Sequence, residues 1–228
     1  AKGTTRLYNA AREPEIDNLI CFLNTTGAKI KRHPDHSVEI AGVSSLNGRS
    51  HRIIGDRLEA GTFLIAAAAT RGEVTVKNVD PMHLEIVLEK LRQAGCHITT
   101  TYDQIHLKAP EEISSVSIDT MPYPGFPTDL QPQWMSLMTT ALGESIIKET
   151  IFENRFQHVP SLRALGANIQ IASPSTVHIS GVSKLQANNM QASDIRAAAA
   201  LLIAGLCAHG ASLIQTAHYI DRGHEDLS

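Results

Sequence analysis

The sequence predicts an α+β protein built from a repeated unit of about seventy residues, and two interleaved series of residues carry this prediction. Glycines that end helix-like runs recur at spacings of 68 and 71 residues, namely Gly27, Gly95 and Gly166. Aspartates that precede apolar, small-residue runs recur at spacings of 73 and 65 residues, namely Asp56, Asp129 and Asp194. Two series with one period indicate one repeated structural unit.

Each unit is predicted to contain the same elements in the same order. An Asp-capped helix, such as residues 56–69, is followed by a strand, and a second helix then ends at one of the glycines. Two alternating segments follow, such as residues 97–108, and form a hairpin. The result is a βαβαββ unit. The first helices are apolar on nearly all sides, so we expect them to be buried under sheets.

Composition narrows the class of protein. The chain has 228 residues, a net charge of −3 and no basic run, so no nucleic-acid partner is expected. The apolar stretch 195–208 is shorter than the roughly 20 residues of a membrane span and contains Arg196, so no membrane partner is expected either. Charged residues interrupt the N-terminal region, which excludes a signal peptide there and predicts a cytoplasmic protein.

The cysteines and histidines show no metal-binding pattern. Cys21, Cys96 and Cys207 lie far apart in apolar surroundings, which predicts inert core thiols rather than a disulfide scaffold or a zinc site. The eleven histidines form no HExxH or similar motif, so no metal is expected. No glycine-rich dinucleotide loop or P-loop occurs.

The segment 123–160 is the most informative part of the chain. Pro124 and Pro127 force an extended or turning backbone, and Thr128 or Asp129 could then cap a helix predicted over residues 130–142. A helix N-terminus attracts anions, and a carboxylate beside it can accept a proton from a bound hydroxyl. Asp129 therefore has two interpretations, a helix cap or a base.

Arginines recur near the predicted helix starts and the turns after the first strands. If the units are related by pseudo-symmetry, Arg155, Arg196 and Arg222 converge, and guanidinium groups there would bind phosphate or carboxylate. Ordinary surface ion pairs are the alternative for each arginine. For Glu13 the alternative is a first-turn charge that complements the helix dipole. An anionic small molecule is the predicted ligand.

Three runs are specific enough to indicate a family. FPTD (126–129), ETIFENRF (149–156) and DRGHE (221–225) resemble the UDP-N-acetylglucosamine 1-carboxyvinyltransferases, the enolpyruvyl transferases that start peptidoglycan synthesis. The resemblance extends from residue 1 to 227. It implies an inverse α/β barrel of two domains, each with three βαβαββ units. Residues 1–54 would be the last part of the first domain, and 55–228 the second domain with its C-terminus truncated.

The resemblance also implies a reaction and a set of site residues. The enolpyruvyl group passes from phosphoenolpyruvate to the 3′-hydroxyl of UDP-N-acetylglucosamine, with no metal or organic cofactor. Asp129 would bind the 3′-hydroxyl and serve as its base, Ile151 would contact the UDP-sugar, and Arg222 would hold the phosphoenolpyruvate carboxylate. The charged residues that would line the site are Arg155, Arg196, Asp194 and Glu13.

The chain departs from the family pattern in ways that affect activity. The lysine–asparagine pair and the reactive-cysteine loop belong to units that are absent here, and His224 stands where tyrosine is usual. Both ends of the chain fall inside a unit, so we expect a portion of a longer protein, inactive without its N-terminal part. Two alternatives stay open: a non-catalytic UDP-sugar-binding module, and the sibling enolpyruvyl transferase of the shikimate pathway.

Overall fold

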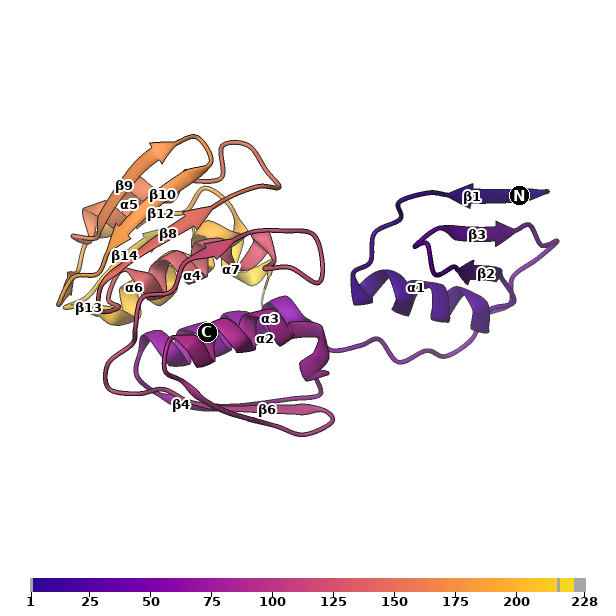
Figure 1. Ribbon diagram of the computed structural model, residues 1–228, viewed down its shortest axis with the longest axis horizontal. Coiled ribbons are helices and arrows are strands. Elements are labelled where there is room, and N and C mark those ends of the chain that lie inside the picture. Colours follow the sequence, from indigo (N-terminus) through magenta and orange to yellow (C-terminus); the bar gives the residue numbers. More distant parts are fainter. Residues whose placement is uncertain (1, 217, 224–228) are drawn as a thin grey trace. The chain divides into compact units, whose positions relative to one another are not determined.

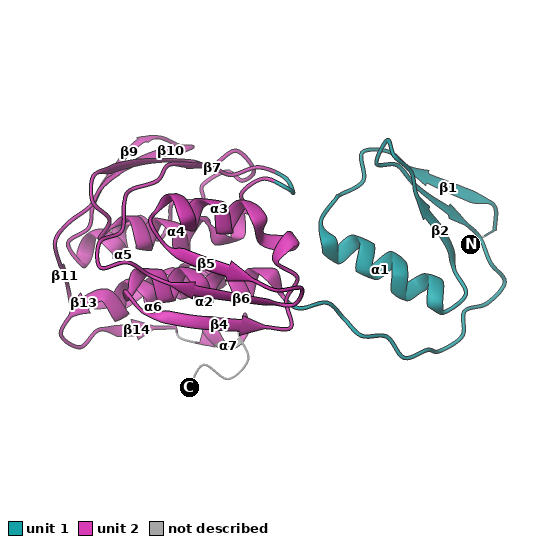
Figure 2. Ribbon diagram, turned by 60° about the horizontal axis from the view of Figure 1, so that its bottom comes forward, with its two compact units in different colours: residues 1–55, 122–124 teal, residues 56–121, 125–228 magenta. Residues whose placement is uncertain are grey.

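The computed structural model describes residues 2–216 and 218–223, and the chain divides into two compact units (Figure 2). The first unit contains residues 1–55 and 122–124. The second contains residues 56–121 and 125–228.

The first unit is a three-stranded antiparallel sheet with one helix. Its elements are β1 (Thr4–Leu7), α1 (Pro14–Thr25), β2 (Lys29–Arg32) and β3 (Val38–Ala41), and the strand order is β1-β3-β2. Pro14 begins the helix because its missing N–H would be unpaired there in any case. Gly27, with φ of 104°, lets the chain turn into β2.

The second unit begins with the same pattern. Its first elements are α2 (Arg57–Ala69), β4 (Glu73–Lys77), the 3₁₀ helix η1 (Pro81–Leu84), α3 (Glu85–Gln93), β5 (His97–Thr100) and β6 (Gln104–Lys108). The strand order β4-β6-β5 repeats that of the first unit, and Gly95 has φ of 103° before β5. One chain topology therefore occurs on both sides of residue 56.

The next repeat adds a leading strand. Its elements are β7 (Ile118–Asp119), the 3₁₀ helix η2 (Thr128–Leu130), α4 (Gln131–Met138), β8 (Glu144–Lys148), α5 (Val159–Ala164), β9 (Asn168–Ser173) and β10 (Thr176–Ser180). The strand order is β7-β8-β10-β9, with β7 parallel to β8 and the other pairs antiparallel. This is the predicted βαβαββ unit.

A further repeat begins after β10. Its described elements are β11 (Leu185–Gln186), β12 (Asn189–Gln191), α6 (Ile195–Cys207), β13 (Ala208–His209), β14 (Leu213–Gln215) and α7 (His218–Asp221). Strand β12 pairs with β14 in parallel, as β7 pairs with β8. The α+β class and the repeat are confirmed.

Three helices form the centre of the second unit. α2, α4 and α6 contact one another and lie between the sheet of β4 and β6 and the sheet of β8, β9 and β10 (Figure 1). Leu64, Trp134 and Leu201 are fully buried among them. The Ser136 hydroxyl crosses between helices and donates to the Ala200 carbonyl at 2.7 Å. The predicted burial of the small-residue helices under sheets is confirmed.

The predicted helix over 130–142 is shorter than expected. It ends at Met138 because distant strands and loops take the next backbone groups: Val182 N–H donates to the Thr139 carbonyl at 2.8 Å, and Leu142 N–H donates to Ile113 at 2.7 Å. At its start, Asp129 lies inside η2 and makes no capping hydrogen bond. The interpretation of Asp129 as a helix cap is therefore wrong.

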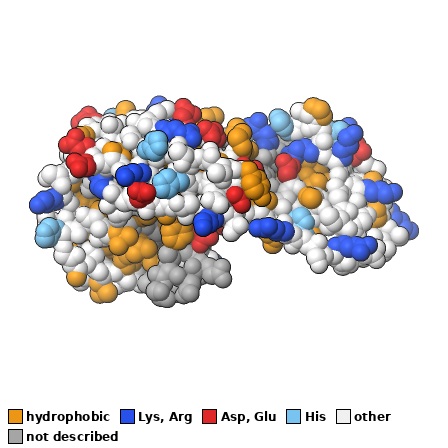
Figure 3. Space-filling view, turned by 90° about the horizontal axis from the view of Figure 1, so that it is seen from below, with side chains coloured by type: hydrophobic (Ala, Val, Ile, Leu, Met, Phe, Trp, Pro, Cys, Tyr) orange, Lys and Arg blue, Asp and Glu red, His pale blue; other side chains and the backbone are white. Residues whose placement is uncertain are grey.

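The surface of the second unit carries charges of both signs (Figure 3). Acidic and basic side chains are interspersed on the face of the second unit drawn in Figure 3. Cys96 is buried and Cys207 partly so, but Cys21 is exposed, so the prediction of a core thiol was wrong for Cys21. Among the described residues, every helix is too short or too polar to cross a lipid bilayer.

Candidate functional site

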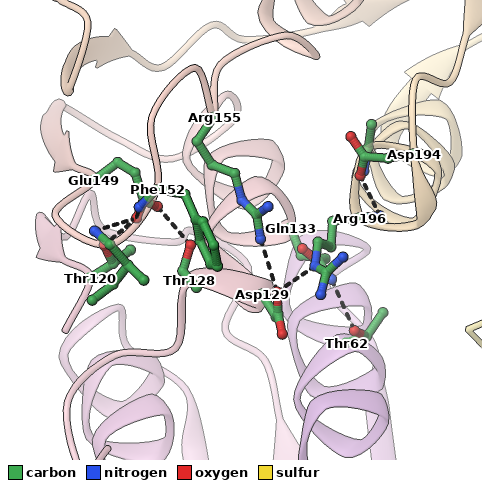
Figure 4. Close-up of polar contacts among 12 residues, drawn as sticks. Thr62, Thr120, Thr128, Asp129, Gln133, Glu149, Phe152, Arg155, Asp194 and Arg196 are labelled. Carbon is green, nitrogen blue, oxygen red and sulfur yellow. Dashed lines mark hydrogen bonds and ion pairs between the residues drawn. The ribbon is translucent and has the colours of Figure 1, made fainter. Parts of the chain in front are cut away.

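Asp129 is the centre of the site. Its Oδ1 accepts a hydrogen bond from Nη2 of Arg155 at 2.9 Å and another from Nε of Arg196. Both guanidinium groups use this one oxygen, and they reach it from two sides (Figure 4). Among the described residues, none donates a hydrogen bond to Oδ2. The carboxylate is thus held in place while one oxygen remains able to accept a proton.

Helix N-termini surround this carboxylate. Asp56 caps α2 by accepting from Leu58 N–H at 2.7 Å and Glu59 N–H at 3.1 Å. Asp194 caps α6 in the same way, through Arg196 N–H at 2.9 Å and Ala197 N–H at 3.1 Å. These two predicted caps are confirmed.

A cavity of about 170 Å³ lies where the three helices begin. It is lined by Asp56 and Glu59 from the start of α2, by Asp129 and Gln133, and by Arg196 from α6. The predicted convergence of helix starts is therefore present. The first N–H groups of α2 and α6 donate to the caps Asp56 and Asp194, so Arg196 is the cationic group that borders this cavity among the described residues.

A second cavity, of about 200 Å³, also borders Arg196. It is lined by Arg155, Asp194 and Arg196 and by the turn 152–154. Arg196 borders both cavities and Asp129 borders the first. Two guanidinium groups, those of Arg155 and Arg196, border the second cavity, where they could contact an anionic ligand.

The electrostatics follow from these contacts. The hydrogen bond to Asp129 raises the pKa of Arg196 above its ordinary value. Burial alone would raise the pKa of Asp194, but hydrogen bonds from Ala197 and Arg196 N–H and from the Ser193 hydroxyl outweigh it, so the pKa is lowered. Burial lowers the pKa of His158, at the edge of the second cavity, to about 4. His158 is therefore neutral near pH 7.

A buried carboxylate, that of Glu149, holds the chain segments next to Asp129 and Ile151. Glu149 is 3% exposed, and its oxygens accept hydrogen bonds from the Thr120 and Thr128 hydroxyls and from Ile151 and Phe152 N–H. Ile151 itself is 37% exposed at the surface of this turn. Glu149 thus fixes the backbone of Ile151, while the Ile151 side chain is open to a ligand.

The remaining predicted residues come from the end of α7 and from the first unit. Arg222 is exposed directly after α7, and its neighbour Gly223 lines the first cavity. Glu13 belongs to the first unit, where it precedes α1 without a capping hydrogen bond. His224 lies outside the described residues. The structure therefore brings Asp129, Arg155, Arg196 and Asp194 together.

Three polar residues, Glu149, Gln133 and Thr62, were missed from the sequence, and Thr128 was considered only as a helix cap. Glu149 and Thr128 lie within the runs ETIFENRF and FPTD, which was a usable signal. Gln133 follows Asp129 by four residues, on the same helix face, and its Nε2 donates to Oγ1 of Thr62 on α2 at 3.2 Å. No group of three or more histidine, cysteine, aspartate or glutamate side chains in the described part of the chain could hold a metal ion.

Known proteins resemble this chain over its whole length. A family model described as EPSP synthase (3-phosphoshikimate 1-carboxyvinyltransferase) matches residues 1–228. UDP-N-acetylglucosamine 1-carboxyvinyltransferase 1 of Carboxydothermus hydrogenoformans is 49% identical over 227 residues, and the enzyme named UDP-N-acetylglucosamine 1-carboxyvinyltransferase of Myxococcus xanthus is 47% identical over 227. Each alignment covers 100% of this chain and 54% of the relative, so the chain spans about half the length of these relatives.

Solved structures show the same fold, and with it confirm the enolpyruvyl transferase-like prediction. The enolpyruvyl transferase NikO from Streptomyces tendae matches with a TM-score of 0.88 and 25% identity, covering 100% of this chain and 54% of NikO. EPSP synthase from Acinetobacter baumannii matches with a TM-score of 0.73 and 18% identity, covering 96% and 54%, which shows the fold alone. With a family model matched over its whole length, the chain belongs to the EPSP synthase family of enolpyruvyl (1-carboxyvinyl) transferases.

Proposed function

We propose that this chain is the C-terminal portion of a UDP-N-acetylglucosamine 1-carboxyvinyltransferase. The enzyme would transfer the enolpyruvyl group of phosphoenolpyruvate to the 3′-hydroxyl of UDP-N-acetylglucosamine and release phosphate, the first committed step of peptidoglycan synthesis, in the cytoplasm. The identity of 45–49% with relatives of that name supports this choice of substrates.

One observation of the site carries the proposal: Asp129 has one oxygen held by two guanidinium groups and one to which no described residue donates. The transfer forms a C–O bond at the sugar hydroxyl, so the hydroxyl proton must leave. A carboxylate in a fixed position is suited to accept it. Oδ2 would take the proton, while Arg155 and Arg196 keep the carboxylate oriented.

The other predicted residues would share the binding of two anionic substrates. Arg222 would hold the phosphoenolpyruvate carboxylate through a bidentate contact. Ile151 would contact the UDP-sugar, and the lining charges would be Arg155, Arg196, Asp194 and Glu13. We propose no metal or organic cofactor.

The proposal includes a division of labour along the full protein. Residues 1–54 would end the first domain, and 55–228 would form most of the second. The N-terminal part of the same protein would supply the lysine–asparagine pair and the reactive-cysteine loop. This chain alone would then supply only part of the substrate-binding site and would not catalyse the transfer.

The shikimate-pathway sibling is the second candidate, because the matching family model carries the description of that enzyme. Sequence identity is 18% with a solved EPSP synthase and 49% with a UDP-N-acetylglucosamine 1-carboxyvinyltransferase. The two candidate enzymes differ in the acceptor of the enolpyruvyl group, so a test of acceptors distinguishes them. A non-catalytic module that binds the UDP-sugar is the third reading.

The test is phosphate release from phosphoenolpyruvate by the full-length protein, measured with each acceptor in turn. We expect release with UDP-N-acetylglucosamine and none with 3-phosphoshikimate. Release with 3-phosphoshikimate but not with UDP-N-acetylglucosamine would support the sibling enzyme. Binding of UDP-N-acetylglucosamine without any phosphate release would support the non-catalytic module.

A further inference from the structure

Glu149 is a buried carboxylate with no ion-pair partner among the described residues. It follows β8 directly, is 3% exposed, and its own N–H donates to the Ser175 carbonyl at 2.8 Å. Within the described ranges 2–216 and 218–223, no lysine, arginine or histidine forms an ion pair with it. Burial of a carboxylate is costly unless hydrogen bonds satisfy it. The hydrogen bonds around Glu149 therefore indicate what this buried carboxylate holds in place.

Four donors from three chain segments meet at this side chain. Oε1 accepts from the Thr120 hydroxyl and Ile151 N–H, both at 2.9 Å, and from Phe152 N–H at 3.1 Å. Oε2 accepts from the Thr128 hydroxyl at 2.9 Å. The donors come from the end of β7, the start of η2 and the turn after β8. One side chain thus fixes these segments relative to one another.

Two routes lead from Glu149 to Asp129 (Figure 4). The first is short, because Thr128 is the residue before Asp129. The second passes through Phe152, since the Arg155 guanidinium lies 4.8 Å from the centre of the Phe152 ring and donates to Asp129 at 2.9 Å. The contacts form a closed ring, so a shift of the turn 151–152 would displace Asp129 and its arginine together.

We propose that Glu149 is a positioning residue that sets the distance between Asp129 and the Ile151–Phe152 turn. The inference rests on the proposed function in one respect: Asp129 is taken as the base, and the turn as a contact of the UDP-sugar. Glu149 would touch neither substrate. Its effect would reach the reaction through Thr128 and Phe152, and a loss of position would lower turnover more than affinity for phosphoenolpyruvate.

The first test needs no substrate and uses this 228-residue chain. Glu149→Gln keeps the size of the side chain but weakens hydrogen bonds that a charge had strengthened. We expect the backbone amides of residues 151–152 to exchange with deuterium about fivefold faster or more, as read by mass spectrometry. Ser180→Ala is the matched control, because it removes a hydroxyl–carboxylate bond of 3.1 Å, to Glu144, at the other end of β8.

The second test measures turnover of the full-length protein. Thr128→Val removes only the hydroxyl that binds Oε2, and Thr128→Ser keeps it. We expect Thr128→Val to lower kcat by on the order of tenfold to a hundredfold, with the KM for phosphoenolpyruvate unchanged, and Thr128→Ser to restore kcat. This pair also covers the case in which Glu149→Gln does not fold.

The outcomes separate this inference from the proposed function. Equal exchange at residues 151–152 in Glu149→Gln and Ser180→Ala would overturn the role of Glu149. Equal kcat in Thr128→Val and Ser180→Ala would overturn the link to Asp129. A wild-type protein without turnover, combined with faster exchange in Glu149→Gln, would overturn the proposed function and support Glu149 as the residue that holds the turn.

Discussion

At the scale of single residues, the two oxygens of Asp129 have different surroundings. Oδ1 is bound by Arg155 and Arg196, and Oδ2 accepts no hydrogen bond among the described residues. Asp129→Asn keeps an oxygen for the guanidinium groups but removes the basic carboxylate, and Asp129→Ala removes both. We expect either change to lower kcat of the full-length protein by about 10²- to 10⁴-fold, because a positioned base contributes that much.

The control for Asp129 is the thermal unfolding midpoint. Asp129→Asn is expected to unfold within a few degrees of the wild type, so that the loss of rate reports chemistry. An unchanged kcat in a normally folded Asp129→Ala variant would contradict the role of base.

Arg222 is predicted to act on one substrate only. If it holds the phosphoenolpyruvate carboxylate, Arg222→Ala removes a bidentate ion pair. We expect the KM for phosphoenolpyruvate to rise by about tenfold or more, and the KM for UDP-N-acetylglucosamine to change less. Steady-state kinetics with each substrate varied in turn measures this. Equal increases in the two values would refute the assignment.

His158 makes stability depend on pH. Its ring is buried, Nε2 lies 3.3 Å from the Met135 sulfur, and burial lowers its pKa from 6.5 to about 4. Between these values the unfolded chain binds a proton that the folded chain does not. The free energy of unfolding is therefore expected to fall as pH decreases from 6.5 to about 4, by up to about 3 kcal/mol.

Urea unfolding of the wild type and of His158→Leu over this pH range measures the effect. Between pH 6.5 and about 4, we expect the difference in unfolding free energy between the two proteins to change by most of the roughly 3 kcal/mol. Parallel curves would mean that His158 does not titrate below its ordinary range.

At the scale of elements, the sequence predicted helix caps and turns correctly where the hydrogen-bond partner lies within a few residues along the chain. Asp56 and Asp194 cap helices through N–H groups two and three residues ahead, and the glycines before β2, β5 and β9 have φ of 104°, 103° and 91°. Asp129 differs because its partners, Arg155 and Arg196, lie 26 and 67 residues away. No local pattern could have shown that they outcompete the helix N–H groups.

Glycines also differ by element, and this gives a matched pair of variants. A Cβ on Gly181, which follows β10, would lie 1.6 Å from the Ala141 carbonyl oxygen, so the backbone would have to move. A Cβ on Gly166 meets no atom within 4 Å, although φ is 91°. We expect Gly181→Ala to lower the free energy of unfolding by about 3 kcal/mol or more, and Gly166→Ala by about 1 to 2 kcal/mol.

Chemical denaturation of both variants tests this order. The comparison isolates the close approach of two backbones from the strain of a positive φ. A larger loss for Gly166→Ala would mean that the turn after β10 relaxes without cost.

At the scale of the whole molecule, the repeat was readable because its period recurs in both glycines and aspartates. The strand order of β1-β3-β2, β4-β6-β5 and the β8-β10-β9 part of the larger sheet follows from it. The candidate site was readable only in part. The motifs indicated Asp129 and the arginines, but the roles of Glu149 and Gln133 depend on hydrogen bonds between elements far apart in the chain. Such bonds become visible only after folding.

The most direct measurement is phosphate release from phosphoenolpyruvate and UDP-N-acetylglucosamine by this chain, with and without the separately produced N-terminal part of the same protein. The account predicts release only when both parts are present, because Asp129 and its arginines lie on this chain and the proposal assigns the reactive-cysteine loop to the N-terminal part. Release by the 228-residue chain alone would contradict it, since the chemistry would then need nothing beyond the site described around Asp129.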